Sequence, residues 1–167
     1  LLGAQTGDWT YFGLQDRASG KEDATYGIAR LKRDVLGNSN VGLLFGDKGF
    51  NGQHNRVIGA DFSLRPGRVY FLNGQVAASR SPGFNARNLA YLVDFTRRTD
   101  RSQVGFSFTR LEPNFETNET GFLRKERFRG SQQTRLELTY SPRPRALNLR
   151  QVFLTGWVDA DQPLSTD

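Results

Sequence analysis

Apolar and polar residues alternate along much of this 167-residue chain. From Ile58 to Leu64, and again from Tyr70 to Ala78, every second residue is apolar or glycine and many of the others are polar. A period of two is the pattern of a β-strand with one apolar and one polar face. Residues 65–68, with the sequence Arg-Pro-Gly-Arg, are typical of a turn. This stretch therefore predicts a β-hairpin whose apolar face contacts either a second sheet or lipid.

The same alternation recurs along the chain, and no window shows a sustained helical period. We therefore predict an all-β protein built as an antiparallel up-and-down meander. All six prolines fall outside the predicted strands, where a missing N–H group costs no ladder bond. The nine predicted strands span residues 3–17, 24–34, 39–46, 55–64, 69–79, 87–97, 102–110, 131–140 and 146–158.

The predicted connections alternate in length along the chain. The long ones cover residues 46–53, 80–86 and 111–130, and the short ones cover residues 35–38, 65–68, 97–101 and 141–145. A meander with tight turns at one end and long loops at the other is typical of outer-membrane β-barrels. Soluble β-sandwiches use Greek-key connections instead. The pattern favours part of a transmembrane β-barrel, with a sandwich as the open alternative.

The two faces of the predicted strands differ in charge. The apolar rows carry no charged residue, as expected where an Arg or Lys at the bilayer centre costs about 2–4 kcal/mol, although a sandwich core is also uncharged. Near the short turns, four residues form a predicted lipid-facing aromatic girdle: Phe62, Tyr70, Phe95 and Tyr140. The opposite rows contain the predicted lumen-facing polar residues: Asp61, Asn73, Gln75, Asn88, Asp94, Arg135 and Glu137.

Average composition does not separate the two alternatives. The hydrophobic fraction is 37% and the mean hydropathy is -0.58, values typical of a soluble protein. A membrane barrel has a similar average because half of each strand faces a polar lumen. No stretch approaches the roughly 20 apolar residues of a spanning helix. The absence of cysteine excludes disulfides, thiolate metal sites and cysteine nucleophiles from this chain.

The net charge of +6 suggests an anionic partner, and the position of the arginines narrows the choice. Together with Lys32 and Arg33, the arginines at the predicted short turns form a basic ring at one end of the sheet, which either binds lipid phosphates or an acidic periplasmic partner, or keeps the turns solvated. We expect no nucleic-acid partner, because the basic residues do not interleave with exposed aromatic residues. The arginines of the ring are Arg65, Arg68, Arg97, Arg98, Arg101, Arg143 and Arg145.

Residues suited to catalysis or metal binding are scarce. His54 is the only histidine and lies in a predicted external loop, so a zinc site or a Cys–His pair is excluded within this chain. Glu112, Glu116 and Glu119 in the longest loop either hold Ca²⁺ through oxygen ligands or form a solvated acidic loop. We predict no enzyme activity, no cofactor and no structural metal.

Residues 26–49 and 55–67 carry a recognisable pattern, as do Gly121, Phe122 and Arg124. Its pieces are Arg30 to Asp34, the strand start at Ser39, and the Val57-x-Gly59-x-Asp61-Phe62 strand. From about Tyr26 to Arg145 the chain resembles the barrel region of a family of bacterial outer-membrane proteins of unknown function. In that family the barrel follows an N-terminal domain like the family-nine carbohydrate-binding modules. The resemblance implies location in the bacterial outer membrane.

These observations lead to ranked functional hypotheses. The first is an outer-membrane β-barrel segment with a polar lumen, acting as a pore, a passive transporter or a membrane anchor for a periplasmic domain. The second is a soluble β-sandwich or lipocalin-like module that binds a carbohydrate or a hydrophobic ligand, and an outer-membrane enzyme comes third. Bacterial single-chain barrels have even strand numbers, so nine strands predict that residues 1–167 are one segment of a larger barrel. The expected partners are membrane lipids and further strands from the parent protein or another chain.

Overall fold

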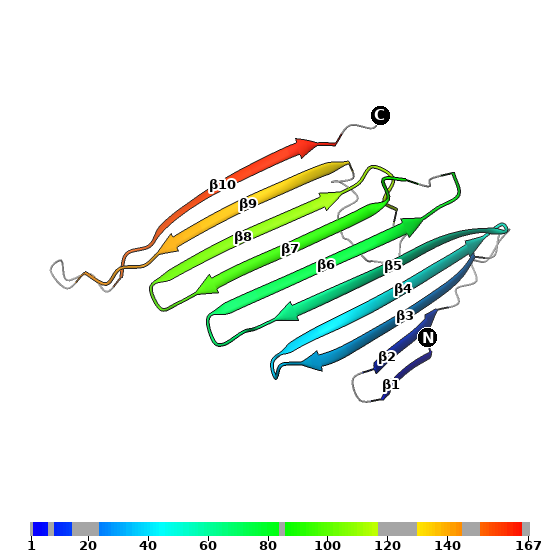
Figure 1. The fold of residues 1–167 in the computed structure, drawn as a ribbon, viewed down its shortest axis with the longest axis horizontal. Coiled ribbons are helices and arrows are strands. Elements are labelled where there is room, and N and C mark those ends of the chain that lie inside the picture. Colours follow the sequence, from blue (N-terminus) through cyan, green and yellow to red (C-terminus); the bar gives the residue numbers. More distant parts are fainter. Residues whose placement is uncertain are drawn as a thin grey trace.

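The computed structural model describes the backbone of residues 2–6, 9–14, 24–83, 86–116, 130–144 and 151–164, with side chains from residue 27 onward. These residues form one antiparallel sheet whose spatial order follows the sequence, which confirms the all-β meander (Figure 1). The strands are β1 (Leu2–Thr6), β2 (Trp9–Leu14), β3 (Ala24–Val35), β4 (Ser39–Phe50), β5 (Gln53–Leu64), β6 (Tyr70–Arg80), β7 (Leu89–Arg98), β8 (Ser102–Leu111), β9 (Ser131–Tyr140) and β10 (Leu154–Pro163).

The eight strands from β3 to β10 are the long ones, with 10 to 12 residues each. Because every strand reverses direction, the connections fall at two opposite ends of the sheet. Residues 36–38, 65–69, 99–101, 141–144 and 151–153 lie at what we call the Arg65 end. Residues 51–52, 81–83, 86–88, 112–116 and 130 lie at the opposite end, the Asn51 end.

The strand count differs from the predicted nine. The predicted strand at residues 3–17 is a hairpin of β1 and β2, in which Thr6 pairs with Trp9. The intervening sequence is Gly7-Asp8, a dipeptide typical of two-residue hairpins. The last strand covers Leu154–Pro163, whereas the predicted strand spans residues 146–158, of which 146–150 lie outside the described residues. Pro163 therefore ends a strand, which is tolerated because β10 is the edge of the described sheet.

The connections do not alternate in length as predicted. The predicted long loop at residues 46–53 is a tight hairpin in which only Asn51 and Gly52 connect β4 to β5. Both residues have positive φ, 49° and 74°, as a type I′ turn requires, and Asn-Gly is the preferred sequence for that turn. The predicted short connection at residues 141–145 does not lead directly into a strand at residue 146 within the described residues, since residues 151–153 also precede β10 without belonging to a strand. Alternating loop length is therefore not an argument for a barrel here.

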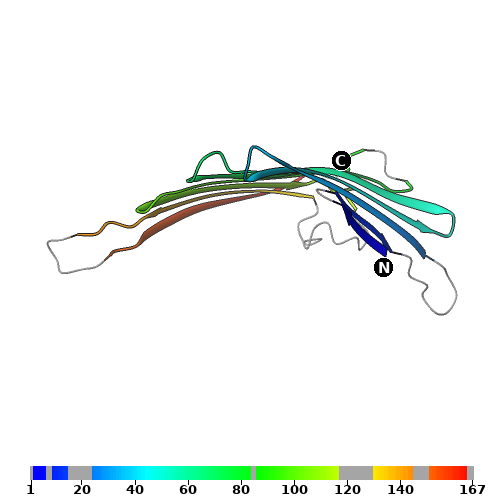
Figure 2. The ribbon, with the colours of Figure 1, turned by 90° about the horizontal axis from the view of Figure 1, so that it is seen from below.

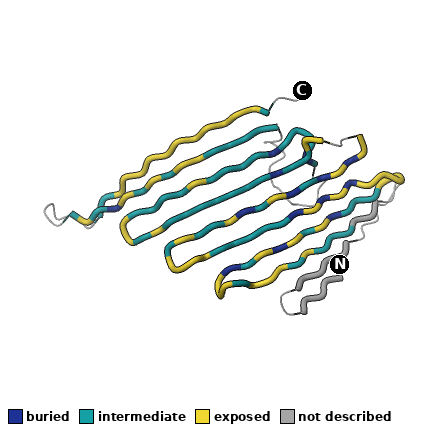
Figure 3. The backbone as a smooth tube through the Cα atoms, viewed as in Figure 1, coloured by how far each residue is buried: buried dark blue, intermediate teal, exposed yellow. Residues whose placement is uncertain are grey.

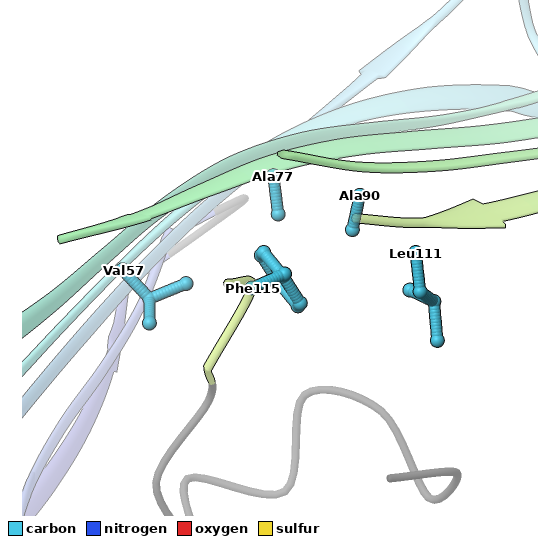
Figure 4. Close-up of a cluster of buried hydrophobic side chains, with 5 residues drawn as sticks. All are labelled: Val57, Ala77, Ala90, Leu111 and Phe115. Atoms are coloured by element: carbon cyan, nitrogen blue, oxygen red, sulfur yellow. The ribbon is translucent and has the colours of Figure 1, made fainter. Parts of the chain in front are cut away.

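The sheet is a single layer that is bowed (Figure 2). We call the concave side the inner face and the convex side the outer face. The side chain of Val57 on β5 projects from the inner face (Figure 4). Successive strand residues point to opposite faces, so the odd-numbered residues of β5, such as Asp61, lie on the inner face and the even-numbered ones, such as Ile58 and Phe62, lie on the outer face. The pairing register carries this assignment to the neighbouring strands.

The described hydrophobic core is small and lies on the inner face. It consists of Val57, Ala77, Ala90 and Leu111 from β5 to β8, and of Phe115 from the segment that follows β8 (Figure 4). Each of these side chains is at most 5% exposed. No second sheet covers either face within the described ranges, since all the described strands belong to one sheet.

Both edges of the described sheet are open. Among the described residues β1 pairs with β2 alone and β10 pairs with β9 alone, so the sheet does not close into a barrel. Every residue of β10 is exposed (Figure 3). We expected an open sheet because nine is an odd number of strands. That reason was wrong, since the described strands number ten, and the openness comes from the two unpaired edges.

Candidate functional site

The inner face is predominantly polar and holds most of the predicted lumen residues. The residues placed there are Asp61, Asn73, Gln75, Asp94, Arg135 and Glu137. Asp61 lies opposite Gln75, and Asn73 lies opposite Asp94. Asn88 precedes β7, and its side-chain amide donates a hydrogen bond to the carbonyl of Ser79. The inner-face residues form a polar surface over β5 to β9, and Asn88 lies beyond the small apolar patch toward the Asn51 end.

An ion pair crosses three strands on the inner face. One guanidinium nitrogen of Arg30, on β3, lies 3.1 Å from each carboxylate oxygen of Asp61, on β5. Gly42 of β4 lies between them and pairs directly with Asp61. A β-carbon at Gly42 would lie 2.7 Å from Asp61 Oδ2, so the missing side chain makes room for the carboxylate. Because Arg30 is 42% exposed, this pair orders polar groups and adds little stability.

A second charged group lies near the other edge of the inner face. Arg135 of β9 is 3.7 Å from a carboxylate oxygen of Glu137 and 3.7 Å from one of Asp159, on β10. These distances exceed the usual range of a hydrogen bond, and Arg135 is half exposed. The three side chains therefore form a loose, hydrated cluster. Such a surface needs no protein layer over it.

The outer face is apolar and exposed. Its uncovered large side chains are Val41, Leu43, Phe45, Ile58, Tyr70, Val76, Phe106, Leu136, Leu138, Tyr140, Leu154 and Val158. They form a continuous band over β4 to β10, far larger than the scattered apolar residues that are normal on soluble proteins. A shallow groove of about 650 Å³ crosses the band between Leu31 and Val93. Such a surface requires an apolar partner.

Charged side chains flank this band at both ends of the strands. Arg33 and Arg97 occupy outer-face positions near the Arg65 end. A cluster lies near the Asn51 end, where Asp47 Oδ1 accepts a hydrogen bond of 3.1 Å from Arg56 Nε, and Arg56 lies opposite Arg80. This second rim was not predicted, because Asp47 falls in the predicted loop at residues 46–53. The outer face is therefore an apolar band between two charged rims.

The band runs obliquely across the strands. One row at right angles to the strands leads from the band on β4 to the rim on β8: Leu43, Ala60, Val76, Tyr91 and Arg110. A second such row starts at Tyr70, at the end of the band on β6, and passes the rim residue Arg97 on β7. It then enters the band on β8 and β9 at Val104 and Leu138. The apolar segment of each strand is thus displaced along the strand relative to that of its neighbour.

The four predicted girdle residues all lie on the outer face. The rings of Tyr70 and Phe95 stack, with centroids 6.4 Å apart and an interplanar angle of 26°. The ring of Phe62 lies over Gly74 of β6, where a β-carbon would overlap it. Tyr140 is the last residue of β9 and is 53% exposed. These positions are toward the Arg65 end of their strands, where an aromatic girdle is predicted.

The described arginines of the predicted basic ring lie at or near the Arg65 end of the sheet. Arg65, Arg68 and Arg101 lie in connections at the Arg65 end, Arg97 and Arg98 end β7, and Arg143 lies in the connection after β9. The guanidinium of Arg65 lies 5.7 Å from the ring centroid of Phe71, and Arg98 Nε donates a 2.8 Å hydrogen bond to Gln103. Arg145 lies outside the described residues. Lys32 and Arg33 are consecutive residues within β3 and therefore point to opposite faces.

The described residues show no catalytic constellation around His54. This residue lies in β5 rather than in a loop, and its Nδ1 is 3.2 Å from Asp47 Oδ2. Within the described part of the chain no hydroxyl group is hydrogen-bonded to the imidazole, so the pair lacks a nucleophile. No group of three or more potential metal ligands occurs among the described residues. Glu112 and Glu116 bond to other protein groups, and Glu119 lies outside the description.

Comparison with known proteins gives no relative for this chain. No protein-family model, curated protein or solved structure matches it. The resemblance to the outer-membrane family therefore stays a prediction. In the part of the chain that the structure describes, no helix is long and apolar enough to cross a membrane.

Proposed function

We propose that this chain forms part of the wall of a bacterial outer-membrane β-barrel, with its outer face in lipid and its inner face toward a polar lumen. In this role it serves as a pore, a passive transporter or the membrane anchor of a periplasmic domain. The observation that carries the proposal is the direction of curvature. The sheet is curved (Figure 2), and the pairing register places the polar residues on its concave face and the exposed apolar residues on its convex face.

Curvature separates this proposal from the soluble alternative. A lipocalin-like barrel encloses its ligand, so the apolar face of such a sheet is the concave one. A β-sandwich covers the apolar face of each sheet with a second sheet. Here the concave face carries Arg30, Asp61 and Arg135, and the described strands provide no second sheet. The polarity is that of a membrane barrel, whose outside is apolar and whose interior is polar.

The dimensions and the charged rims also support a membrane location. A transmembrane strand needs roughly 9–11 residues, and β3 to β10 have 10 to 12. Charged groups bound the apolar band at both ends, which is where lipid headgroups and water replace hydrocarbon. Arg33 and Arg97 at one rim, and Arg56 and Arg80 at the other, carry the charge that suits lipid phosphates.

The open edges require further strands in a membrane. An unpaired strand edge in hydrocarbon leaves N–H and C=O groups without partners, at several kcal/mol for each group. Among the described residues, β1 and β10 present such edges. We expect further strands of the same parent protein, or of a partner chain, to pair with both.

Refolding in the presence of liposomes tests the proposal. Together with the further strands that β1 and β10 require, the chain should float with liposomes in a density gradient and gain resistance to protease, while in detergent-free buffer it should aggregate. The matched control is a variant that replaces Leu43, Ile58 and Val76, three uncovered residues of the outer face, with serine. This variant should lose flotation. A wild-type chain that stays monomeric and folded in buffer and does not float would support the soluble binding module instead.

A further inference from the structure

The segment after β8 folds back onto the inner face. Phe115, its most deeply buried residue, is 5% exposed and points toward the strands (Figure 4). It packs with Val57, Ala77, Ala90 and Leu111, which come from β5 to β8. Most other side chains of the inner face are polar. The segment therefore meets the wall at an apolar patch on an otherwise polar surface.

Small residues make room for this segment. Gly59, Ala77 and Ala90 lie directly opposite one another on β5, β6 and β7. Ala77 and Ala90 belong to the same buried cluster as Phe115. Their small side chains leave room for the aromatic ring on the inner face, and the same chain supplies that ring.

Backbone hydrogen bonds attach the segment at both ends. The N–H of Glu112 donates to the carbonyl of Leu89 at 3.0 Å, and the N–H of Asn114 donates to the carbonyl of Arg87 at 2.9 Å. The N–H of Glu116 donates to the hydroxyl of Ser79 at 2.9 Å. These partners belong to β6, to the start of β7 and to the residues that connect them, so the segment is bonded across neighbouring strands.

Side-chain hydrogen bonds attach both acidic residues of the segment. The backbone N–H of Leu89 donates to Glu112 Oε2 at 2.9 Å. The hydroxyl of Ser81 donates to Glu116 Oε2 at 3.0 Å and accepts a hydrogen bond from the side-chain amide of Asn55. Charged acceptors make these bonds stronger than neutral ones. The carboxylates therefore hold the segment in place and fix its position on the wall.

We propose that residues 112–116 form a fixed constriction that limits the size of the solutes passing through the lumen. The inference rests on the proposed function, because only a barrel has a lumen to narrow. A segment that covers the inner face over β5 to β8 reduces the free cross-section near the Asn51 end. Its bonds to the wall make it a permanent part of the passage, and Phe115 anchors it.

Solute uptake by liposomes that contain the intact protein tests the constriction. Phe115→Ser removes the anchor, and swelling rates with sugars of increasing size should then show a loss of size discrimination. The largest sugar should gain most in rate and the smallest should gain least. Phe71→Ala is the matched control, because it removes an aromatic ring from the same face at the other end of β6. It should leave the discrimination unchanged.

A milder variant covers the case in which Phe115→Ser does not fold. Ser79→Ala combined with Ser81→Ala removes only the two hydroxyls that bond Glu116, and it should also weaken size discrimination. Folding is followed by flotation and protease resistance. Folded variants with the size discrimination of the wild type would overturn the constriction and leave the barrel intact. A wild-type protein that does not float with liposomes would overturn the proposed function itself.

Discussion

Asp61 and Phe62 are consecutive residues of β5 that lie on opposite faces, and each sits beside a glycine of a neighbouring strand. The carboxylate of Asp61 occupies the space beside Gly42 of β4 and meets Arg30. The ring of Phe62 covers Gly74 of β6. A glycine on the neighbouring strand thus makes room for a charged carboxylate on the inner face and for an aromatic ring on the outer face.

The two faces should differ in how well they tolerate amino-acid substitutions. On the inner face the group beside glycine is a partly exposed carboxylate that can turn toward water. On the outer face it is an aromatic ring that lies against the backbone of the sheet, as aromatic residues often do over strand glycines. We therefore expect changes on the outer face to be costly and equivalent changes on the inner face to be mild. The following predictions are ordered from the largest expected effect to the smallest.

The largest effect should follow from a charge in the middle of the outer face. Val93→Arg should destabilise the protein in lipid by about 2–4 kcal/mol, because the guanidinium enters hydrocarbon. Asn73→Arg, on the inner face of the neighbouring strand, should fold nearly normally. Denaturant titration in lipid vesicles measures both. Equal losses would show that the two faces meet the same environment and would remove the lumen from the proposal.

Gly74→Ala should have the next largest effect. The added methyl overlaps the ring of Phe62, and moving that ring should cost about 1–3 kcal/mol. Phe62→Ala removes the ring, so Gly74→Ala should cost much less when it is introduced into that variant. Unfolding free energies of the wild type, both single variants and the double variant measure the coupling. Additive effects would mean that the ring does not lie on Gly74.

Gly42→Ala should be milder than Gly74→Ala. The methyl displaces the Asp61 carboxylate from Arg30, a partly exposed pair worth about 0.2–1 kcal/mol. The loss should disappear in an Asp61→Ala background, and in the wild-type background it should shrink as salt is added. Stability measurements at low and high salt test this. A salt-independent loss would point to backbone strain rather than to the ion pair.

Arg135→Ala should have the smallest effect. Its two carboxylate neighbours are 3.7 Å away and the side chain is half exposed, so the change in unfolding free energy should stay below about 0.5 kcal/mol. The same denaturant titration measures it. A loss as large as that of Gly74→Ala would show that the inner face is buried in the assembled protein.

Alternation alone predicted the central strands and their faces. Residues 131–140 were predicted as a strand and form β9, and β5 to β8 differ from their predictions by a few residues at most. The apolar rows and the polar rows separate onto opposite faces because a strand has a fixed period of two. The alternation is a local property of the sequence. Where it was regular, it was sufficient to predict the strand and its two faces.

The remaining features depend on contacts that a period does not contain. The charged strand end at Asp47 resembles a loop until the Asn51-Gly52 turn is recognised, because that turn pairs Asp47 with Arg56 across the hairpin. Phe115 packs with residues that come from four strands, β5 to β8. The structural role of Gly42 follows only from the pairing register, which places it beside Asp61. Strand register and long-range packing therefore determine the charged rim, the packing of Phe115 and the role of Gly42, none of which the alternation predicts.

The oblique course of the apolar band defines a tilt angle. Leu43, the middle of the band on β4, is in register with Val76, whereas Leu138, the middle on β9, is in register with Tyr70. The band thus shifts by about six residues over about five strands, and with a rise of ~3.3 Å and a strand spacing of ~4.8 Å this shift equals a tilt of about 40°. Strands in barrels are tilted by roughly 35–45°.

That tilt also sets the thickness of membrane that the band can span. The apolar row of β6 runs from Tyr70 to Ala78, a length of about 26 Å along the strand. At a tilt of about 40° its height across the bilayer is about 20 Å, well below the ~30 Å core of a typical bilayer. The bacterial outer membrane is thinner than average. A protein with this wall should therefore insert fastest into liposomes of short-chain lipids.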